Sequence, residues 1–201
     1  MSKVIATITT SVDGFVAGPD DKPGRGLGEA GERLHYWVFG GPWAYETERE
    51  PGEGMTKADQ EFFEELTSGV GAYICGRGMY DAGGGWGGSN PFQGPLWVVT
   101  HRVEDQPHPE AGFTFIDSLE AALEAATAAA GDKDIAISGG ADVIRQALSS
   151  GKVDILAIST APVILGKGKH LFEGFDQDID LEIESVRTSP YAVHTIYTIR
   201  R

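Results

Sequence analysis

The stretch "AISGGADVIRQAL" (136–148) joins an apolar run directly to a helical pattern. The run stops at Ser138-Gly139-Gly140, and the residues from Ala141 onward already follow the helical pattern, so no residues remain for a loop. Glycine tolerates backbone conformations and close approaches that other residues do not. Two interpretations are open: the glycines permit tight packing of a strand against a helix, or they let an anionic group touch the backbone.

Strand and helix patterns alternate along most of the chain. We expect strands at 3–10, 71–75, 95–100, 113–116, 134–138 and 153–165. We expect helices at 56–69, 117–131 and 140–151, and a helix-like piece at 29–41. The segments 180–188 and 191–200 alternate and meet at Ser189-Pro190, which predicts an antiparallel pair. This order predicts an α/β fold with a mainly parallel sheet, in one domain that spans 1–201.

Local signals refine this prediction. Asp117 is the expected N-cap of the helix at 117–131, with Glu120 at the third helical position and Gly131 as its terminator. The glycine tract 83–90 predicts a flexible loop. The segment 18–55 is rich in Gly, Pro and charged residues, and an irregular insertion of this length is usually functional or mobile.

Composition excludes several classes of function. The formal net charge of −14 argues against nucleic acids and anionic membranes, because both attract a basic surface. No apolar run approaches the roughly 20 residues of a membrane span. The single cysteine, Cys75, cannot form an internal disulfide, which fits a cytoplasmic protein; it lies in an apolar strand and is expected to be a buried, inert thiol.

Glycines or cations follow four of the predicted strands. The four strand ends are Gly76-Arg77, Thr100-His101-Arg102, Gly139-Gly140 and the run Gly166-Lys167-Gly168-Lys169. Ligands of open parallel sheets bind at the carboxyl ends of the strands, where glycine amides, helix N-termini and arginine side chains bind phosphate. Each feature alone has a second interpretation, as a tight turn or a solvated cation. Together they predict a polyanionic ligand, with a nucleotide as the first candidate.

Other nucleotide and catalytic motifs are missing from the sequence. The first strand is not followed by G-x-G-x-x-G, and the chain has no P-loop. The five histidines and one cysteine show no metal-ligand spacing, so we expect no metal. A G-x-S-x-G nucleophile turn is also absent.

Five segments in order resemble the dihydrofolate-reductase-like superfamily, and most closely its branch with the reductase domain of bacterial riboflavin biosynthesis. These segments are "TITTSVDGFVAG" (7–18), "ICGRGMYD" (74–81), "WVVTHR" (97–102), "IAISGGADVIRQAL" (135–148) and "STAPVILGKGKHLF" (159–172). The resemblance implies a three-layer sandwich around a sheet of about eight strands, NADPH as hydride donor, and a homodimer. We expect self-association at an edge strand near 191–200.

The resemblance also implies roles for individual residues. Two groups would face the cofactor diphosphate: Gly76, Arg77, Gly78 and Met79, and Gly139, Gly140, Ala141, Asp142, Val143 and Ile144. Thr100, His101 and Arg102 would hold the adenosine 2′-phosphate. Thr9 and Ala17 would offer backbone groups to the nicotinamide amide, under a mobile loop at 13–18.

Other residues are candidates for proton transfer and substrate binding. Asp13 and Asp59 are the candidate proton donors, with water as the alternative, although the acids of the helix at 56–68 also fit a solvated surface. Lys167, Lys169 and His170 could bind a phosphorylated substrate. The aromatic residues between 35 and 45 either line a pocket for a flat ligand or bury the insertion against the core.

Three functional interpretations follow. The first is a cytoplasmic NADPH-dependent reductase of a small heterocyclic or sugar-like substrate, such as a riboflavin-pathway or pterin-like compound. The second is a non-catalytic NADP(H)-binding module that senses redox state or regulates a partner. The third is a structural α/β domain that binds no nucleotide.

Overall fold

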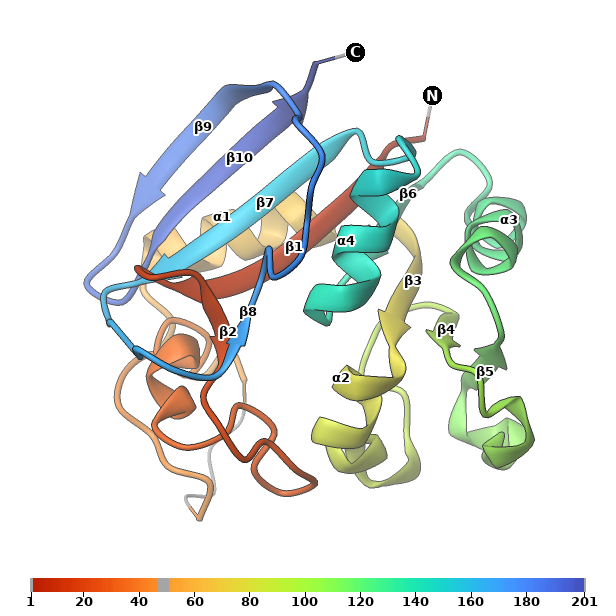
Figure 1. The fold of residues 1–201 in the computed structure, drawn as a ribbon, viewed down its shortest axis with the longest axis horizontal. Coiled ribbons are helices and arrows are strands. Elements are labelled where there is room, and N and C mark those ends of the chain that lie inside the picture. Colours follow the sequence, from red (N-terminus) through yellow and green to blue (C-terminus); the bar gives the residue numbers. More distant parts are fainter. Residues whose placement is uncertain (1, 47–50, 201) are drawn as a thin grey trace.

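Eight strands form the central sheet of the fold, and the computed structural model describes residues 2–46 and 51–200. The strands are β1 (Val4–Ser11), β3 (Val70–Gly76), β4 (Leu96–Val99), β5 (Phe113–Ile116), β6 (Asp134–Ile137), β7 (Ile155–Ala161), β9 (Leu181–Thr188) and β10 (Val193–Ile199). Their order across the sheet is β5-β4-β3-β6-β1-β7-β10-β9 (Figure 1). All neighbours from β5 to β7 pair in parallel, whereas β10 runs antiparallel to both β7 and β9. The predicted α/β class, mainly parallel sheet and terminal hairpin are confirmed.

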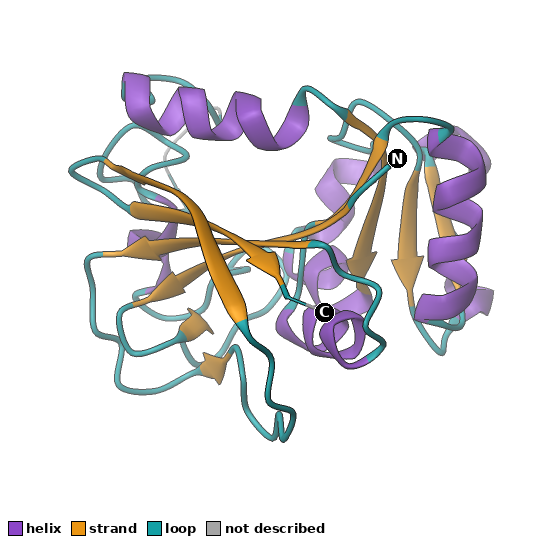
Figure 2. Ribbon diagram, turned by 90° about the horizontal axis from the view of Figure 1, so that it is seen from above, coloured by secondary structure: helices purple, strands orange, loops and turns teal. Residues whose placement is uncertain are grey.

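Helices cover both faces of the sheet. They are α1 (Lys57–Thr67), α2 (Arg77–Ala82), α3 (Leu119–Ala130) and α4 (Ala141–Ser149). Phe62 of α1 packs on Ile5 and Ile196 on one face, while α3 and α4 bury their apolar sides against Ile74 and Ile137 on the other. Figure 2 shows the strands between these helical layers. The arrangement is the three-layer sandwich that the sequence resemblance implied.

The beginning of α3 differs from its predicted position. Ser118, and not Asp117, is the N-cap, because its backbone is extended and its Oγ accepts a hydrogen bond from the Ala121 amide at 3.2 Å. Asp117 therefore precedes the helix and lies on the wall of the cavity described below. Both residue types cap helices well, so the sequence alone did not separate them.

The insertion between β1 and α1 contains less helix than expected. Within the expected 29–41 piece, the structure forms only a 3-10 helix at Gly31–His35, followed by turns. Two short strands, β2 (Phe15–Ala17) and β8 (Lys169–His170), pair in a separate small sheet. The glycine tract 83–90 forms tight turns over Gly84–Gly88, where Gly85, Trp86 and Gly87 all have positive φ.

The C-terminal strands also correct two details. The expected strand 153–165 is paired only over Ile155–Ala161, since Pro162 and the following residues leave the sheet. The segment near 191–200 is not an edge strand: β10 lies between β7 and β9, and the outer strand is β9. A sequence pattern shows which residues alternate, but it does not show which strand of a hairpin lies outermost.

Candidate functional site

A cavity of about 1500 Å³ runs along the carboxyl ends of four neighbouring parallel strands. Its wall includes Thr9 of β1, Gly76 of β3, Thr100 after β4 and Ser138 after β6. Parallel strands bring these ends to one edge of the sheet, although the residues are far apart in sequence. The strand ends that carry glycines and cations in the sequence thus border one space, except for the run at 166–169, of which Lys169 alone reaches the wall.

The two glycines before α4 have different structural reasons. Gly139 has a φ of 118°, and a Cβ there would lie 3.3 Å from Cδ1 of Ile8 and 3.4 Å from Sδ of Met79. Gly140 has ordinary extended backbone, but a Cβ there would meet no atom within 4 Å, and the residue lines the cavity. The positive φ, together with the close side chains of Ile8 and Met79, therefore explains Gly139, whereas Gly140 keeps part of the cavity open. The peptide bond between them is cis.

The N-terminus of α4 borders the cavity. Gly140 caps the helix without a side-chain hydrogen bond, and Ala141, Asp142 and Val143 of the first turn all line the cavity. The first amides of a helix lack intrahelical partners and carry the positive end of its dipole, which attracts anions. Ile144 is fully buried and holds the helix on the sheet, so it contributes position and no direct contact. This end of α4 can therefore receive a phosphate group.

A second close turn joins β3 to α2. Gly76 is the N-cap, and the residues from Gly76 to Met79 all line the cavity. A Cβ at Gly78 would also meet no atom within 4 Å. The starts of α2 and α4 therefore both border the cavity, and each contains a glycine at which a side chain would extend into unoccupied space.

The residues after β4 form a third part of the wall. Thr100 is buried, and its Oγ1 accepts a hydrogen bond from the Arg102 amide at 3.0 Å. His101 and Arg102 are exposed at the rim, and all three residues border the cavity. The structure thus brings together the three residues that the resemblance assigned to the 2′-phosphate.

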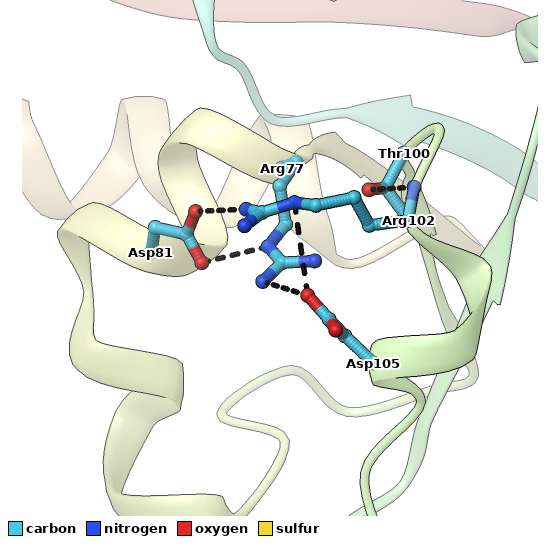
Figure 3. A network of polar contacts seen from close by, with 5 residues as sticks. All are labelled: Arg77, Asp81, Thr100, Arg102 and Asp105. Atoms are coloured by element: carbon cyan, nitrogen blue, oxygen red, sulfur yellow. Dashed lines mark hydrogen bonds and ion pairs between the residues drawn. The ribbon is translucent and has the colours of Figure 1, made fainter.

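The two arginines at this rim are held by carboxylates (Figure 3). Arg77 donates from Nε to Asp81 at 2.7 Å and from Nη2 to Asp105 at 2.9 Å. Arg102 donates from Nη2 to Asp81 at 3.2 Å, and its Nε lies 3.6 Å from Asp105. Although partial burial acts to lower the pKa of Arg77, the bonds to Asp81 and Asp105 raise it overall, so the guanidinium stays charged.

At the other end of the cavity lie Thr9 and Ala17, the residues expected to face the nicotinamide. Both are buried and both line the cavity. Oγ1 of Thr9 accepts a hydrogen bond from Nε1 of Trp37 at 3.1 Å, so this side chain is already paired. Any contact from Thr9 to a ligand would therefore come from its backbone, as the resemblance implies.

Asp13 ties two loops together and is not among the residues that line the cavity. Its carboxylate accepts hydrogen bonds from the Ser11 hydroxyl at 2.6 Å and from the Leu165 and Gly166 amides at 3.1 and 2.7 Å. The Ser11 hydroxyl, with help from these amides, lowers the pKa of Asp13 to about 2. This environment favours a permanently charged, positioning carboxylate over a proton donor.

Asp59 belongs to a buried hydrogen-bonded chain. Its Oδ1 lies 2.8 Å from Nε2 of His194, and Nδ1 of His194 lies 2.8 Å from Oγ of Ser159. Burial lowers the pKa of His194 despite the opposing effect of Asp59, so the imidazole is neutral, donates to Asp59 and accepts from Ser159. All three residues are at most 2% exposed and none lines the cavity, so a substrate has no access to this Ser-His-Asp chain.

Aromatic side chains from the insertion serve both of the expected purposes. Trp37 packs against Phe62 and His194 in the core and also borders the cavity. Phe39 and Trp43 pack in a tilted arrangement with ring centroids 4.3 Å apart, and Trp43 and Tyr45 meet edge to face at 5.2 Å. All four line the cavity. They form an aromatic wall at the end of the cavity near Thr9.

Of the polar groups at this wall, Tyr45 is paired within the protein and His35 is neutral, whereas the buried Nε1 of Trp43 has no hydrogen-bond partner among the described residues. The Tyr45 hydroxyl accepts from the Leu27 amide at 2.9 Å and donates to the Gly28 carbonyl at 3.3 Å, and burial raises the pKa of Tyr45 to about 12. Burial lowers the pKa of His35, which also lines the cavity, to about 4. The wall therefore offers mainly flat apolar surface.

The candidate phosphate-binding lysines have acidic partners. Nζ of Lys167 lies 3.5 Å from Glu29, and Lys169 forms an ion pair with Asp21. The His170 ring meets the edge of Phe15, and its Nδ1 accepts from the Phe172 amide at 3.3 Å. Lys169 and His170 line the cavity, whereas Lys167 does not. The pairing leaves little free positive charge for a substrate phosphate.

Sequence reasoning missed several of these groups. His194, Ser159 and the carboxylates of Asp81 and Asp105 were not singled out, although Asp81 follows Arg77 at the i,i+4 spacing of a helical ion pair. In the described ranges 2–46 and 51–200, no group of three or more His, Cys, Asp or Glu side chains is placed to hold a metal ion. Within those same ranges, no helix has the length and apolarity to span a bilayer.

Similar structures share the whole fold. A candidate riboflavin biosynthesis protein from Shewanella sp. PV-4 superimposes with a TM-score of 0.71 at 20% identity, over 99% of both chains. A pyrimidine reductase-like protein from Corynebacterium diphtheriae gives 0.66 at 16% identity, over 100% of this chain and 92% of that one. Dihydrofolate reductase from Enterococcus faecalis, complexed with NADP(H) and RAB-propyl, gives 0.58 at 16% identity, over 99% and 97%. These likenesses confirm the dihydrofolate-reductase-like fold.

Sequence comparison identifies a relative that matches part of the chain and a family model that matches nearly all of it. The uncharacterized protein YyaP of Bacillus subtilis (strain 168) is 41% identical over 66 residues, which cover 32% of this chain and 35% of that protein. The model of the RibD C-terminal domain family matches residues 2–195. Together with the fold, this match supports a reductase of the dihydrofolate-reductase-like type. Because the match spans nearly the whole chain, the protein belongs to the RibD C-terminal domain family.

Proposed function

We propose that this protein is a cytoplasmic NADPH-dependent reductase that transfers a hydride to an electron-poor C=N or C=O bond of a small heterocyclic or sugar-like substrate. The observation that carries the proposal is one cavity bordered by the starts of two helices and by the Thr100–Arg102 rim. Each helix start contains a glycine, Gly78 or Gly140, at which a Cβ would meet no atom within 4 Å. The buried free thiol of Cys75, whose pKa burial raises to about 12, is inert and fits a reducing compartment.

The residues of the cavity fit a dinucleotide in three places. The diphosphate would face Gly76–Met79 and Gly139–Val143, where helix amides and absent side chains permit close approach. The 2′-phosphate would contact Thr100, His101 and Arg102, and the Arg77 guanidinium lies beside this position because Asp81 and Asp105 each contact both arginines. The backbone of Thr9 and Ala17 would orient the nicotinamide amide beside the aromatic wall.

When bound, NADPH supplies the hydride, and the protein contributes orientation and electrostatics. The aromatic wall of Trp37, Phe39, Trp43 and Tyr45 would stack the substrate ring and exclude water from one side. Asp13 is held as a carboxylate and Asp59 is sealed by His194, so we assign the final proton to water.

Replacement of Arg102 tests the proposal most simply. Arg102→Ala should weaken NADPH binding by about 1.5–3 kcal/mol, the usual contribution of a charged hydrogen bond, and should leave NADH binding unchanged. Calorimetric titration measures both affinities. Arg200→Ala, which removes a similarly exposed and acid-paired arginine elsewhere, is the matched control. If neither nucleotide binds the wild-type protein, the proposal fails.

The role of the lysines near β8 needs a separate test. Lys167→Ala with Lys169→Ala should raise the KM for a phosphorylated substrate if these residues bind it, and should leave NADPH affinity unchanged. The control is the pair Lys22→Ala and Lys152→Ala. The ion pairs to Glu29 and Asp21 favour the opposite result, in which phosphate groups on the substrate give no advantage.

The alternative function is a non-catalytic NADP(H)-binding module that senses redox state or regulates a partner. This alternative would be supported if the protein binds NADPH but does not oxidise it with any of a panel of heterocyclic carbonyl and imine compounds. Steady oxidation with any of them assigns catalysis.

We also propose that the protein forms a homodimer through its outer strands. Leu181, Ile183, Val186 and Val193 of β9 and β10 are 40–64% exposed, and β9 ends the sheet. An exposed apolar edge of this kind is a usual site of pairing with another copy. Sedimentation should show a dimer that Ile183→Lys dissociates; a wild-type monomer would rule it out.

A further inference from the structure

The two arginines at the cavity rim and their two acidic partners form a ring of four charged groups (Figure 3). Asp81 and Asp105 each contact both Arg77 and Arg102. Two guanidinium groups repel each other, so an anion between them is needed to hold them side by side. The four charges cancel, and the ring as a whole is neutral.

The two carboxylates are anchored differently. Asp81 lies on α2 four residues after Arg77, so helical geometry itself holds this pair together at 2.7 Å. Asp105 ends the short 3-10 turn Val103–Asp105, whose residues are all exposed, and its contact with Arg102 is the longest of the four at 3.6 Å. When Asp105 leaves the ring, it gives up its 2.9 Å hydrogen bond from Nη2 of Arg77, while the bond to Asp81 still holds Arg77 on α2.

We propose that Asp105 holds, in the cofactor-free protein, the anion position between Arg77 and Arg102 that the adenosine 2′-phosphate takes when NADPH binds. The inference rests on the proposed function, because it requires an NADPH-binding cavity. A phosphate monoester carries nearly two negative charges and three acceptor oxygens, so it can replace one carboxylate and bridge both guanidinium groups.

Asp105 is thus a specificity-determining residue for the cofactor. Its carboxylate competes with the 2′-phosphate of NADPH and lowers the apparent affinity, whereas NADH presents only a hydroxyl group at this position and does not displace it. The competition moderates the preference for NADPH that Arg77 and Arg102 would otherwise give.

The test compares Asp105→Asn with Glu104→Gln by calorimetric titration of NADPH and NADH. Glu104 neighbours Asp105 on the same turn, and its replacement makes the same change in net charge, yet within the described residues it belongs to no ion pair. We expect Asp105→Asn to bind NADPH about fivefold more tightly, the upper range for a partly exposed ion pair. NADH affinity should change by less than about twofold, and Glu104→Gln should resemble the wild type.

A second measurement uses inorganic phosphate as the probe. Millimolar phosphate should raise the melting temperature of Asp105→Asn more than that of the wild type, because the variant has an anion position to fill. Weaker NADPH binding by Asp105→Asn would overturn the proposal and make Asp105 a positioning residue for the arginines. Equal tightening for NADPH and NADH, or equal tightening by Glu104→Gln, would overturn it as well. If wild-type protein binds no NADPH, the proposed function itself fails, which is a separate result.

Discussion

Gly78 provides a test in which stability and cofactor affinity should move in opposite directions. The residue lies in the first turn of α2 and lines the cavity, and a Cβ there would meet no atom within 4 Å. Gly78→Ala should therefore fit the folded protein without a clash. Alanine also restricts the unfolded chain, so we expect the free energy of unfolding to rise by about 0.5 kcal/mol.

The same methyl group would occupy the space that we propose for the cofactor diphosphate. Loss of close backbone approach should weaken NADPH binding at least tenfold, which is about 1.4 kcal/mol. Urea denaturation measures the stability, and calorimetric titration measures the affinity. Unchanged or tighter NADPH binding would refute the assignment of Gly78 to the diphosphate site, and a loss of stability would refute the argument that the space is open.

Further predictions concern the buried polar groups. Asp59→Ala leaves the buried Nε2–H of the neutral His194 without an acceptor and should lower the free energy of unfolding by about 2 kcal/mol. NADPH affinity should not change, because neither residue lines the cavity. An exposed control, Glu61→Gln, should change stability little. Burial lowers the pKa of His35 in the folded protein from its ordinary 6.5 to about 4, so the unfolded chain binds its proton first as the pH falls. The contribution of neutral His35 to the free energy of unfolding is fully present above pH 6.5. It should decline by about 3 kcal/mol as the pH drops to 4. His35→Gln should remove that part of the decline in urea titrations at successive pH values; an unaltered pH profile in the variant would contradict the buried neutral state.

The sequence predicted the features that local pattern determines. The alternation of strands and helices, the terminal hairpin and the strand ends with glycines and cations all follow from periodicity and composition. The double glycine at 139–140 indicated a close turn, and the structure gives a different reason for each glycine. Gly139 has a positive φ and lies close to Ile8 and Met79, whereas Gly140 borders the open cavity.

Features that depend on distant residues were not predictable in this way. Asp59 and His194 are 135 positions apart, and only the fold brings the helix and the last strand together. The partners of Lys167 and Lys169 lie in the insertion near residues 21–29, so the sequence showed free cations where the structure shows ion pairs. The same reason applies to Asp105, whose carboxylate reaches Arg77 from the 3-10 turn that follows β4.

Hydrogen exchange of the backbone amides with and without NADPH would show whether the cofactor lies across the carboxyl ends of the parallel strands. We expect NADPH to slow exchange at the amides of Gly76–Met79 and Ala141–Val143, because the diphosphate would accept hydrogen bonds from helix starts at the carboxyl ends of β3 and β6. Peptides from β9 and β10, away from the cavity, should exchange at unchanged rates. Protection confined to other segments, or no protection at saturating NADPH, would contradict the claim that the cofactor lies across these strand ends.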